Sequence, residues 1–85
     1  MCVGQVNYKG LVIYENINDE FKSSYYSIYN KFNNKHVHST AEFLSKKIVD
    51  CYWHLYNNNF GEIKRYSKNI RNKAFSLLGN KVLFR

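Results

Sequence analysis

The sequence lacks proline, has only two cysteines, and contains no apolar run longer than the four residues Leu11–Tyr14. A membrane-spanning helix needs about 20 apolar residues, and a secretory signal needs a hydrophobic region of about seven or more. We therefore expect neither, and we predict a soluble cytoplasmic protein without a membrane partner. Cys2 and Cys51 follow no spacing typical of a disulfide framework or a metal site, so we expect two reduced thiols.

Acidic residues are also few, and the resulting positive charge is unevenly placed. Thirteen Lys and Arg stand against six Asp and Glu, for a net charge of +7. Residues 1–61 hold six basic and five acidic side chains, whereas residues 62–85 hold seven and one. A surface of this sign favours polyanions such as DNA, RNA, acidic protein surfaces or anionic membranes. A charged face that only keeps the protein soluble has the same composition, so charge alone does not decide.

The length and composition predict one small folded domain. The chain has 85 residues, of which 45% are hydrophobic, and this is enough for a single core. Residues 11–14 are β-branched or aromatic, which predicts a first strand. The polar residues 16–22 predict a loop after it.

A hairpin is predicted in the middle of the chain. The apolar residues between positions 21 and 32 fit both a helical and an alternating spacing. Asn33 and Asn34 then decide for strands, because asparagine tolerates the left-handed conformation that a tight turn requires. We therefore predict that residues 24–32 pair with residues 35–40.

The main helix is predicted from Phe43 to about Asn57. Its apolar side consists of Leu44, Ile48, Cys51, Tyr52 and Leu55. Ser39 together with Glu42, or alternatively Thr40, would cap the start of this helix. The asparagines at positions 57–59 and Gly61 would end it.

A second, basic helix is predicted from Ser67 to Leu78. Ser67 is a plausible N-cap, and Gly79-Asn80 would end the helix. Its apolar stripe is Ile70, Ala74 and Leu77. Lys64, Lys68 and Arg71 fall at positions i, i+4 and i+7, so they would share one helical face. Residues 82–84 would form a last strand or an apolar contact segment.

Several short motifs follow one another in the first two thirds of the chain: Tyr8-Lys9-Gly10-Leu11, Tyr26-Ser27-Ile28, Val37, Tyr52 and Phe60-Gly61-Glu62. In their order and spacing, these motifs resemble AP2-like DNA-binding domains, known from plant transcription factors and from phage-encoded homing endonucleases. The resemblance covers residues 8–62.

The fold class is predicted as α+β. The resemblance implies a three-stranded antiparallel sheet packed against one main helix, and the spacing of apolar residues predicts the same arrangement. Residues 1–62 would form this sheet-plus-helix domain, and residues 63–85 a basic C-terminal extension, mainly a helix, packed on the same domain.

The sequence departs from the AP2-like pattern in ways that bear on function. Family members contact DNA through sheet positions rich in Arg and Trp, whereas the matching positions here hold no arginine, which disfavours bidentate reading of guanine. The family's helix alanines are replaced by the larger Ile48, Val49 and Leu55. The outward sheet positions are Val12, Tyr14, Tyr25, Ser27, Tyr29, Lys31, Lys35, His36 and His38.

The candidate binding residues fall into a sheet group and a tail group. Tyrosines on the sheet would stack on unpaired bases, although each could equally pack in the core or against the tail helix. Basic residues of the tail would neutralise phosphates, although they could also form only a solvated helix face. The sheet group is Lys9, Tyr14, Tyr25, Tyr29, Lys31, Lys35, His36 and His38, and the tail group is Lys64, Arg65, Lys68, Arg71 and Lys73.

Histidine chemistry is the main alternative use of the sheet. His36 and His38 alternate on a strand and, with Cys51 or His54, would provide metal ligands or an acid–base pair. A metal site normally has a tighter ligand set, and no third polar group of evident role accompanies the pair. We predict no metal, no cofactor and no catalytic activity. Trp53 would be either a core residue or an exposed contact for a partner.

The sequence therefore predicts a small, non-enzymatic nucleic-acid-binding protein, with RNA or single strands favoured at least as much as duplex DNA. Its small size and its content of Tyr, Asn and Lys are typical of a phage accessory protein, which would act in the host cytoplasm. The alternative is a counter-defence inhibitor that binds a host protein such as a toxin RNase, directly or bridged by RNA. A remnant of a homing endonuclease is a third interpretation. The target and the oligomeric state stay open.

Overall fold

The protein is an α+β domain in which an antiparallel sheet precedes the helices. A computed structural model describes residues 2–20 and 22–79. Four strands pair in chain order: β1 (Cys2–Tyr8), β2 (Leu11–Asn18), β3 (Ser23–Asn30) and β4 (Lys35–Ser39). The helices α1 (Glu42–Tyr56), α2 (Phe60–Ile63) and α3 (Lys68–Leu78) follow. The predicted α+β class with an antiparallel sheet is confirmed.

The predicted number of strands was wrong, because β1 was missed. β1 and β2 are joined by a two-residue turn in which Lys9 and Gly10 both have positive φ, at 49° and 84°. A turn of this hand matches the twist of the paired strands. β1 is an edge strand with mostly exposed side chains, so its sequence lacks the apolar alternation that marks a half-buried strand. The predicted loop was also too long, since β2 continues to Asn18.

The predicted hairpin of β3 and β4 is confirmed, with a longer turn. Residues 31–34 form the connection, and only Asn34 has a positive φ, at 62°. The backbone carbonyl of Asn30 accepts the amide of Asn34 at 2.9 Å and that of Asn33 at 3.3 Å. Left-handed asparagine therefore closes the turn, as expected, but at one position.

The helix bounds lie close to those predicted, although one cap differs. Ala41 is the N-cap of α1 and makes no side-chain cap bond, so the prediction of Ser39 or Thr40 was wrong. Ser39 Oγ instead accepts from the Ala41 amide at 3.4 Å and donates to the Ala41 carbonyl at 3.1 Å. The cap of α3 is confirmed, because Ser67 Oγ accepts the Ile70 amide at 3.3 Å.

Beyond α3, only the predicted stop at Gly79 can be compared with the structure. Gly79 follows the helix with a φ of 79°. The expectation for residues 82–84 lies outside the described residues. The short helix α2 lies between α1 and α3, where no helix was predicted.

The core lies between one face of the sheet and the layer formed by α1 and α3. The sheet contributes Leu11, Ile13 and Ile28, all at most 2% exposed. The predicted apolar side of α1 is confirmed at Ile48, Cys51, Tyr52 and Leu55, and α3 adds Ala74 and Leu77. The buried aliphatic side chains of α1 are Ile48, Val49 and Leu55.

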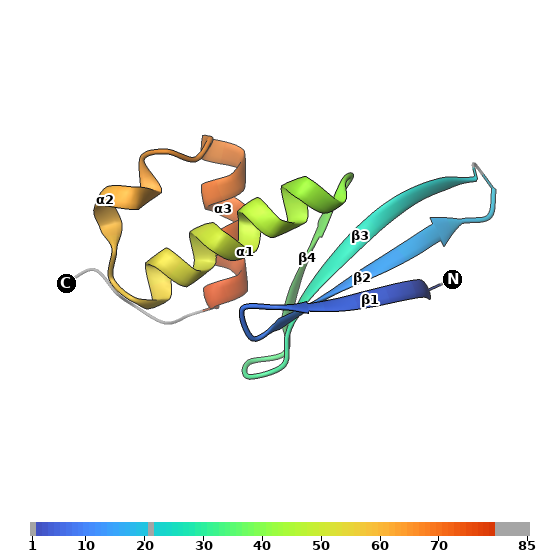
Figure 1. Cartoon of the computed structure of the whole chain (residues 1–85), viewed down its shortest axis with the longest axis horizontal. Helices are drawn as coiled ribbons and strands as arrows, with labels where there is room; N and C mark the ends of the chain where they lie inside the picture. The colour runs from blue at the N-terminus through green and yellow to red at the C-terminus, as the bar shows by residue number, and fades with distance from the viewer. Residues whose placement is uncertain (1, 21, 80–85) are drawn as a thin grey trace.

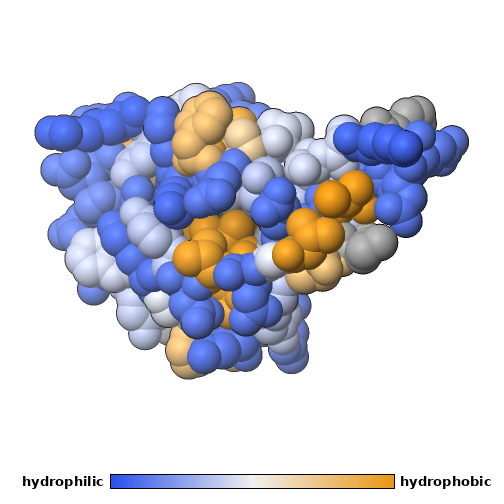
Figure 2. All heavy atoms as spheres, turned by 45° about the vertical axis from the view of Figure 1, so that its right-hand side comes forward, coloured by the Kyte–Doolittle hydropathy of each residue, from blue (hydrophilic) through white to orange (hydrophobic). Residues whose placement is uncertain are grey.

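The helices cover only part of the sheet. In Figure 1 the outer halves of β1, β2 and β3 project beyond α1, and α3 lies beside the end of the sheet that carries β4. The described chain is correspondingly elongated, measuring 45 × 25 × 18 Å along its principal axes. Figure 2 shows a mostly hydrophilic surface with hydrophobic patches on the body and at the base of the projecting strands. Val3 and Val6 are the exposed apolar residues of β1. None of the described helices combines the length and the apolar composition needed to cross a bilayer.

Candidate functional site

Strand register divides the sheet into a helix-covered face and a free face. Side chains directly opposite one another across neighbouring strands lie on the same face. The row of Val6, Ile13, Ile28 and Val37 faces the helices, since Ile13 and Ile28 are core residues. The rows on either side of it therefore point away from the helices. These rows are Asn7, Val12, Tyr29 and His36, and Gln5, Tyr14, Ser27 and His38; with Asn16 and Tyr25 they define the free face.

The free face brings together the tyrosines and histidines that the sequence singled out. Tyr25, His36 and His38 are exposed, and Tyr14 and Tyr29 are half-buried. None of the three tyrosines belongs to the core, where Tyr8, Tyr26, Tyr52 and Tyr66 pack instead. The alternative that the sheet tyrosines fill the core is therefore wrong for all three.

Hydrogen bonds and ring contacts hold these side chains in position. Asn16 Nδ2 donates to Ser27 Oγ at 3.1 Å, and Ser27 Oγ shares a 3.1 Å hydrogen bond with His38 Nδ1. The His38 ring lies edge-on to Tyr25 and His36, with centroids 6.1 Å and 5.5 Å away. Such edge contacts are favourable arrangements for aromatic rings. The face is thus an ordered set of rings with polar groups between them.

The acidic residues lie elsewhere in the described chain. Glu15 occupies the row of Tyr26 on the helix-covered face, and Asp19 and Glu20 lie between β2 and β3 at the tip of the sheet. The other three, Glu42, Asp50 and Glu62, belong to α1 and α2. Among the described residues, the free face therefore carries no carboxylate that would repel phosphate.

Three predicted lysines do not join this face. Lys9 lies in the turn before β2, where its Nζ is 2.6 Å from Asp50 Oδ1 and 5.2 Å from the centroid of the Trp53 ring. The hydrogen bond with Asp50 raises the pKa of Lys9. Lys31 lies in the β3–β4 turn. Lys35 pairs with Asn30, so the prediction that it points outward was wrong: it lies on the helix-covered side, against Gly79.

One lysine of the basic tail contacts the β4 edge of the sheet. Lys73 Nζ donates to the backbone carbonyl of His38 at 2.6 Å, which places this ammonium group at the β4 edge of the free face. Lys68 is exposed at the start of α3. This contact makes the free face and α3 neighbours.

The helical face expected of Lys64, Lys68 and Arg71 was wrong. Lys64 precedes α3 and ends α2, and Arg65 pairs with Glu62 at 3.1 Å. Arg71 is half-buried, and its Nε atom has no hydrogen-bond partner among the described residues. A single helix does not run through all three positions, because the stretch between Ile63 and Lys68 is not helical.

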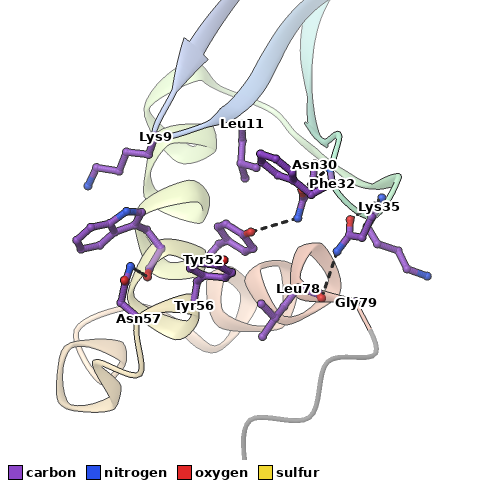
Figure 3. Close-up of a pocket in the computed structure, with 12 residues that line it drawn as sticks. Lys9, Leu11, Asn30, Phe32, Lys35, Tyr52, Tyr56, Asn57, Leu78 and Gly79 are labelled. Carbon is purple, nitrogen blue, oxygen red and sulfur yellow. Dashed lines mark hydrogen bonds between the residues drawn. The ribbon is translucent and has the colours of Figure 1, made fainter.

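An open groove on the helix-covered side of the sheet was not predicted. It has a volume of about 700 Å³ and lies between the two hairpin turns and the C-terminal ends of α1 and α3 (Figure 3). Trp53, which the sequence left as either core or contact residue, is 39% exposed on its wall. The residues lining this aromatic groove are Lys9, Leu11, Asn30, Phe32, Asn33, Lys35, Tyr52, Trp53, Tyr56, Asn57, Leu78 and Gly79.

The metal alternative finds no converging side chains among the residues that the structure describes. His36 and His38 point from the free face, whereas Cys51 is a fully buried residue of α1, on the other side of the sheet. Within residues 2–20 and 22–79, no three His, Cys, Asp or Glu side chains gather where they could hold a metal ion. Burial raises the pKa of the Cys51 thiol to about 11, so the reactive thiolate is not its form at neutral pH.

Comparison with known proteins gives no relative: no family model matches the chain, and neither a curated protein nor a solved structure shows significant similarity to it.

Proposed function

We propose that this protein is a small, non-enzymatic nucleic-acid-binding module, and that its free face takes the unpaired bases of RNA or of a single DNA strand. The observation that carries the proposal is the register, which gathers Tyr14, Tyr25, Tyr29, His36 and His38 on one face, with no carboxylate there among the described residues. Both the tyrosine and the histidine rings offer a flat surface to a base. Stacking on such rings tolerates any base, because every base has a π-face.

The chemistry of the free face favours unpaired bases over duplex DNA. Reading guanine in the major groove depends mainly on bidentate arginine or lysine, and neither residue type is among the described strand residues of the free face. Ser27 and Asn16 instead supply hydroxyl and amide groups beside the rings, which can bond to the exposed edges of splayed bases. The rings themselves need the open π-face of an unpaired base, which a stacked duplex does not offer.

Phosphate binding is assigned to the β4 edge and to α3. Lys73 lies next to His38, and Lys68 is exposed on the same helix. With a net charge of +7, the protein attracts polyanions over long range. Affinity should accordingly fall as the salt concentration rises, because each neutralised phosphate releases counterions.

The likeness to AP2-like domains enters the proposal as an origin for the scaffold. In such a domain the sheet is the recognition surface, and here it would have exchanged arginine for tyrosine and histidine. A cytoplasmic accessory protein of phage type fits this use, with the two histidines acting in recognition rather than in catalysis.

Binding assays with three nucleic acids test the proposal. We expect labelled single-stranded RNA and single-stranded DNA to bind at low salt more tightly than a duplex of the same length, with Lys68→Glu weakening all three. Lys47→Glu, on the exposed surface of α1, is the matched control and should change binding less. Weak binding of all three at low salt would contradict the proposal. The inhibitor alternative would then lead, and a pull-down with and without nuclease would separate a direct protein partner from one bridged by RNA.

A further inference from the structure

The aromatic groove exposes three large rings that the proposed function does not use. Phe32 is 76% exposed, Tyr56 55% and Trp53 39%. Phe32 comes from the β3–β4 turn, whereas the other two come from the last turns of α1. In Figure 3 Phe32 lies on the sheet side and Tyr56 on the helix side, with Tyr52 between them; the rings of Tyr52 and Tyr56 are stacked, with centroids 6.1 Å apart. Exposed apolar groups gathered around a hollow are typical of a ligand site.

The charges around the groove are positive. Lys9 and Lys35 flank it on opposite sides (Figure 3), and none of the described residues that line it is acidic. Lys9 forms an ion pair with Asp50, which is not among the residues that line the groove. Lys35 forms no ion pair with the carboxylates of the described residues, so it is the better placed of the two for an anionic group.

The wall of the groove is built by specific bonds rather than by loose packing. Asn33 Nδ2 donates to the carbonyls of Leu77 and Leu78 at 3.0 Å and 3.2 Å, which ties the β3–β4 turn to the end of α3. Asn30 Nδ2 donates to the same Leu77 carbonyl at 3.0 Å and to the Tyr52 hydroxyl at 3.3 Å. A preformed wall lowers the entropy that a ligand would otherwise lose in ordering it.

Gly79 is what allows the turn and the helix end to approach so closely. A Cβ atom at this position would lie 3.1 Å from Asn33 Nδ2 and 3.4 Å from Lys35 Cε. The absence of that atom lets the amide of Asn33 and the stem of Lys35 lie against the backbone. The placement of Lys35 at the groove therefore depends on the glycine.

A nucleotide satisfies these features better than an apolar ligand does. Its base is flat and stacks on tyrosine, tryptophan and phenylalanine, while its phosphate requires a cation at the edge of the site. A volume of about 700 Å³ lies within the range of about 300–1,000 Å³ that is usual for small-ligand sites. A purely apolar ligand would leave both lysines unused.

We propose that the aromatic groove binds one unpaired nucleotide, with its base against the exposed ring of Tyr56 and its phosphate at Lys35. The choice of a nucleotide over a peptide rests on the proposed function. The groove and the free face are separated by the β3–β4 turn, and Tyr29 of the free face donates its hydroxyl to Asn34 of that turn at 2.6 Å. A strand that crosses the free face beside Tyr29 reaches the groove by passing this turn.

Trp53 provides a direct assay, because it is the only tryptophan of the chain and lies on the wall of the groove. We expect each of the four nucleoside monophosphates to change its fluorescence saturably. The nucleosides should bind more weakly, and inorganic phosphate alone should have no effect at the same concentration. Tyr56→Ala should weaken binding by about 5- to 150-fold, the range given by about 1–3 kcal/mol of base stacking. Lys35→Ala should abolish the advantage of monophosphates over nucleosides.

Matched controls separate this site from the free face. Phe43→Ala removes an exposed ring at the other end of α1 and should leave the titration unchanged. Tyr25→Ala on the free face should also leave it unchanged while weakening the binding of a long single strand, so each proposal can fail without the other. Three results would overturn the groove proposal: no saturable change with any monophosphate, an equal loss in Phe43→Ala, or a saturable response to an acidic phenylalanine-containing peptide alone. Self-association that Tyr56→Ala abolishes would also overturn it, because a second copy would then fill the groove.

Discussion

Replacing the buried Asn30 by alanine should destabilise the protein strongly, because this side chain connects β3, the following turn, α1 and α3. Asn30 is 1% exposed, and its side chain makes three hydrogen bonds. The amide group donates to Tyr52 Oη at 3.3 Å and to the Leu77 carbonyl at 3.0 Å. The amide oxygen accepts from the Phe32 backbone at 3.1 Å.

The size of the effect follows from these bonds. Each contributes about 0.5–1.5 kcal/mol net, and a buried group left without a partner adds to the loss. The Leu77 carbonyl keeps the bond from Asn33, so part of the penalty is avoided. We expect Asn30→Ala to lower the free energy of unfolding by about 2–4 kcal/mol. With a urea m-value of about 1 kcal/mol/M, the urea midpoint should fall by about 2 M or more.

A second measurement tests whether the bond to Tyr52 is the one lost. Burial raises the pKa of Tyr52, and the bond from Asn30 lowers it again by stabilising the phenolate. In Asn30→Ala, the pKa of Tyr52 should therefore rise further, as followed by the near-ultraviolet absorbance of the folded protein. Asn72→Ala, at an exposed position of α3, is the matched control and should change stability by less than about 0.5 kcal/mol. A midpoint for Asn30→Ala as high as that of the control would refute the reasoning.

Three further predictions concern the glycine, the ion pair and the thiols. Gly79→Ala should lower the free energy of unfolding by about 1–2 kcal/mol, because its φ of 79° and the Asn33 contact at 3.1 Å both oppose a Cβ atom. Gly61→Ala is the control and should not destabilise the protein, because the space around Gly61 is open. Equal thermal midpoints of the two variants would contradict this prediction. Asp50 raises the pKa of Lys9 and, through a 2.9 Å bond, that of Tyr8. The stability that this cluster contributes is therefore fully present below about pH 10 and is lost as the pH rises through the raised pKa values of Lys9 and Tyr8. Asp50→Asn should accordingly reduce the fall of the urea midpoint at alkaline pH. An unchanged fall would contradict this role of Asp50. Of the two thiols, exposed Cys2 should react with a disulfide reagent at once and buried Cys51 only on unfolding; rapid reaction of a Cys2→Ser variant in the folded state would show that Cys51 is accessible.

The elements with a strong local signal could be predicted from the sequence. The apolar stripe of α1, the Ser67 cap of α3 and the turn at Asn34 each depend on residues close together in the chain. β1 could not be recognised in this way, because it is an exposed edge strand and takes its structure from pairing with β2. The Lys9-Gly10 turn was the available signal, since two residues of positive φ between paired strands are typical of a hairpin.

The candidate sites divide along the same line. The tyrosines and histidines of the free face alternate along single strands, so their common direction follows from local spacing. Lys35 was misplaced because Asn30 and Lys35 pair on the helix-covered face across a longer turn than expected. The aromatic groove is formed by two turns and two helix ends that are distant in sequence, and no local sequence pattern predicts that these segments lie together. Asn30 is buried although the nearby Phe32 is exposed, because Asn30 bonds to the Leu77 carbonyl of α3, a contact that the local sequence does not indicate.

The most direct test of the central claim measures whether the rings of the free face bind unpaired bases. Fluorescence anisotropy with a labelled, unstructured single-stranded RNA should give an affinity that falls with salt. Tyr25→Ala and Tyr29→Ala should each weaken it by about 1–3 kcal/mol, and Phe43→Ala, which removes an exposed ring off the face, should leave it unchanged. If the two tyrosine variants bind as tightly as the unaltered protein, the free face is not the binding surface and the proposed function is wrong.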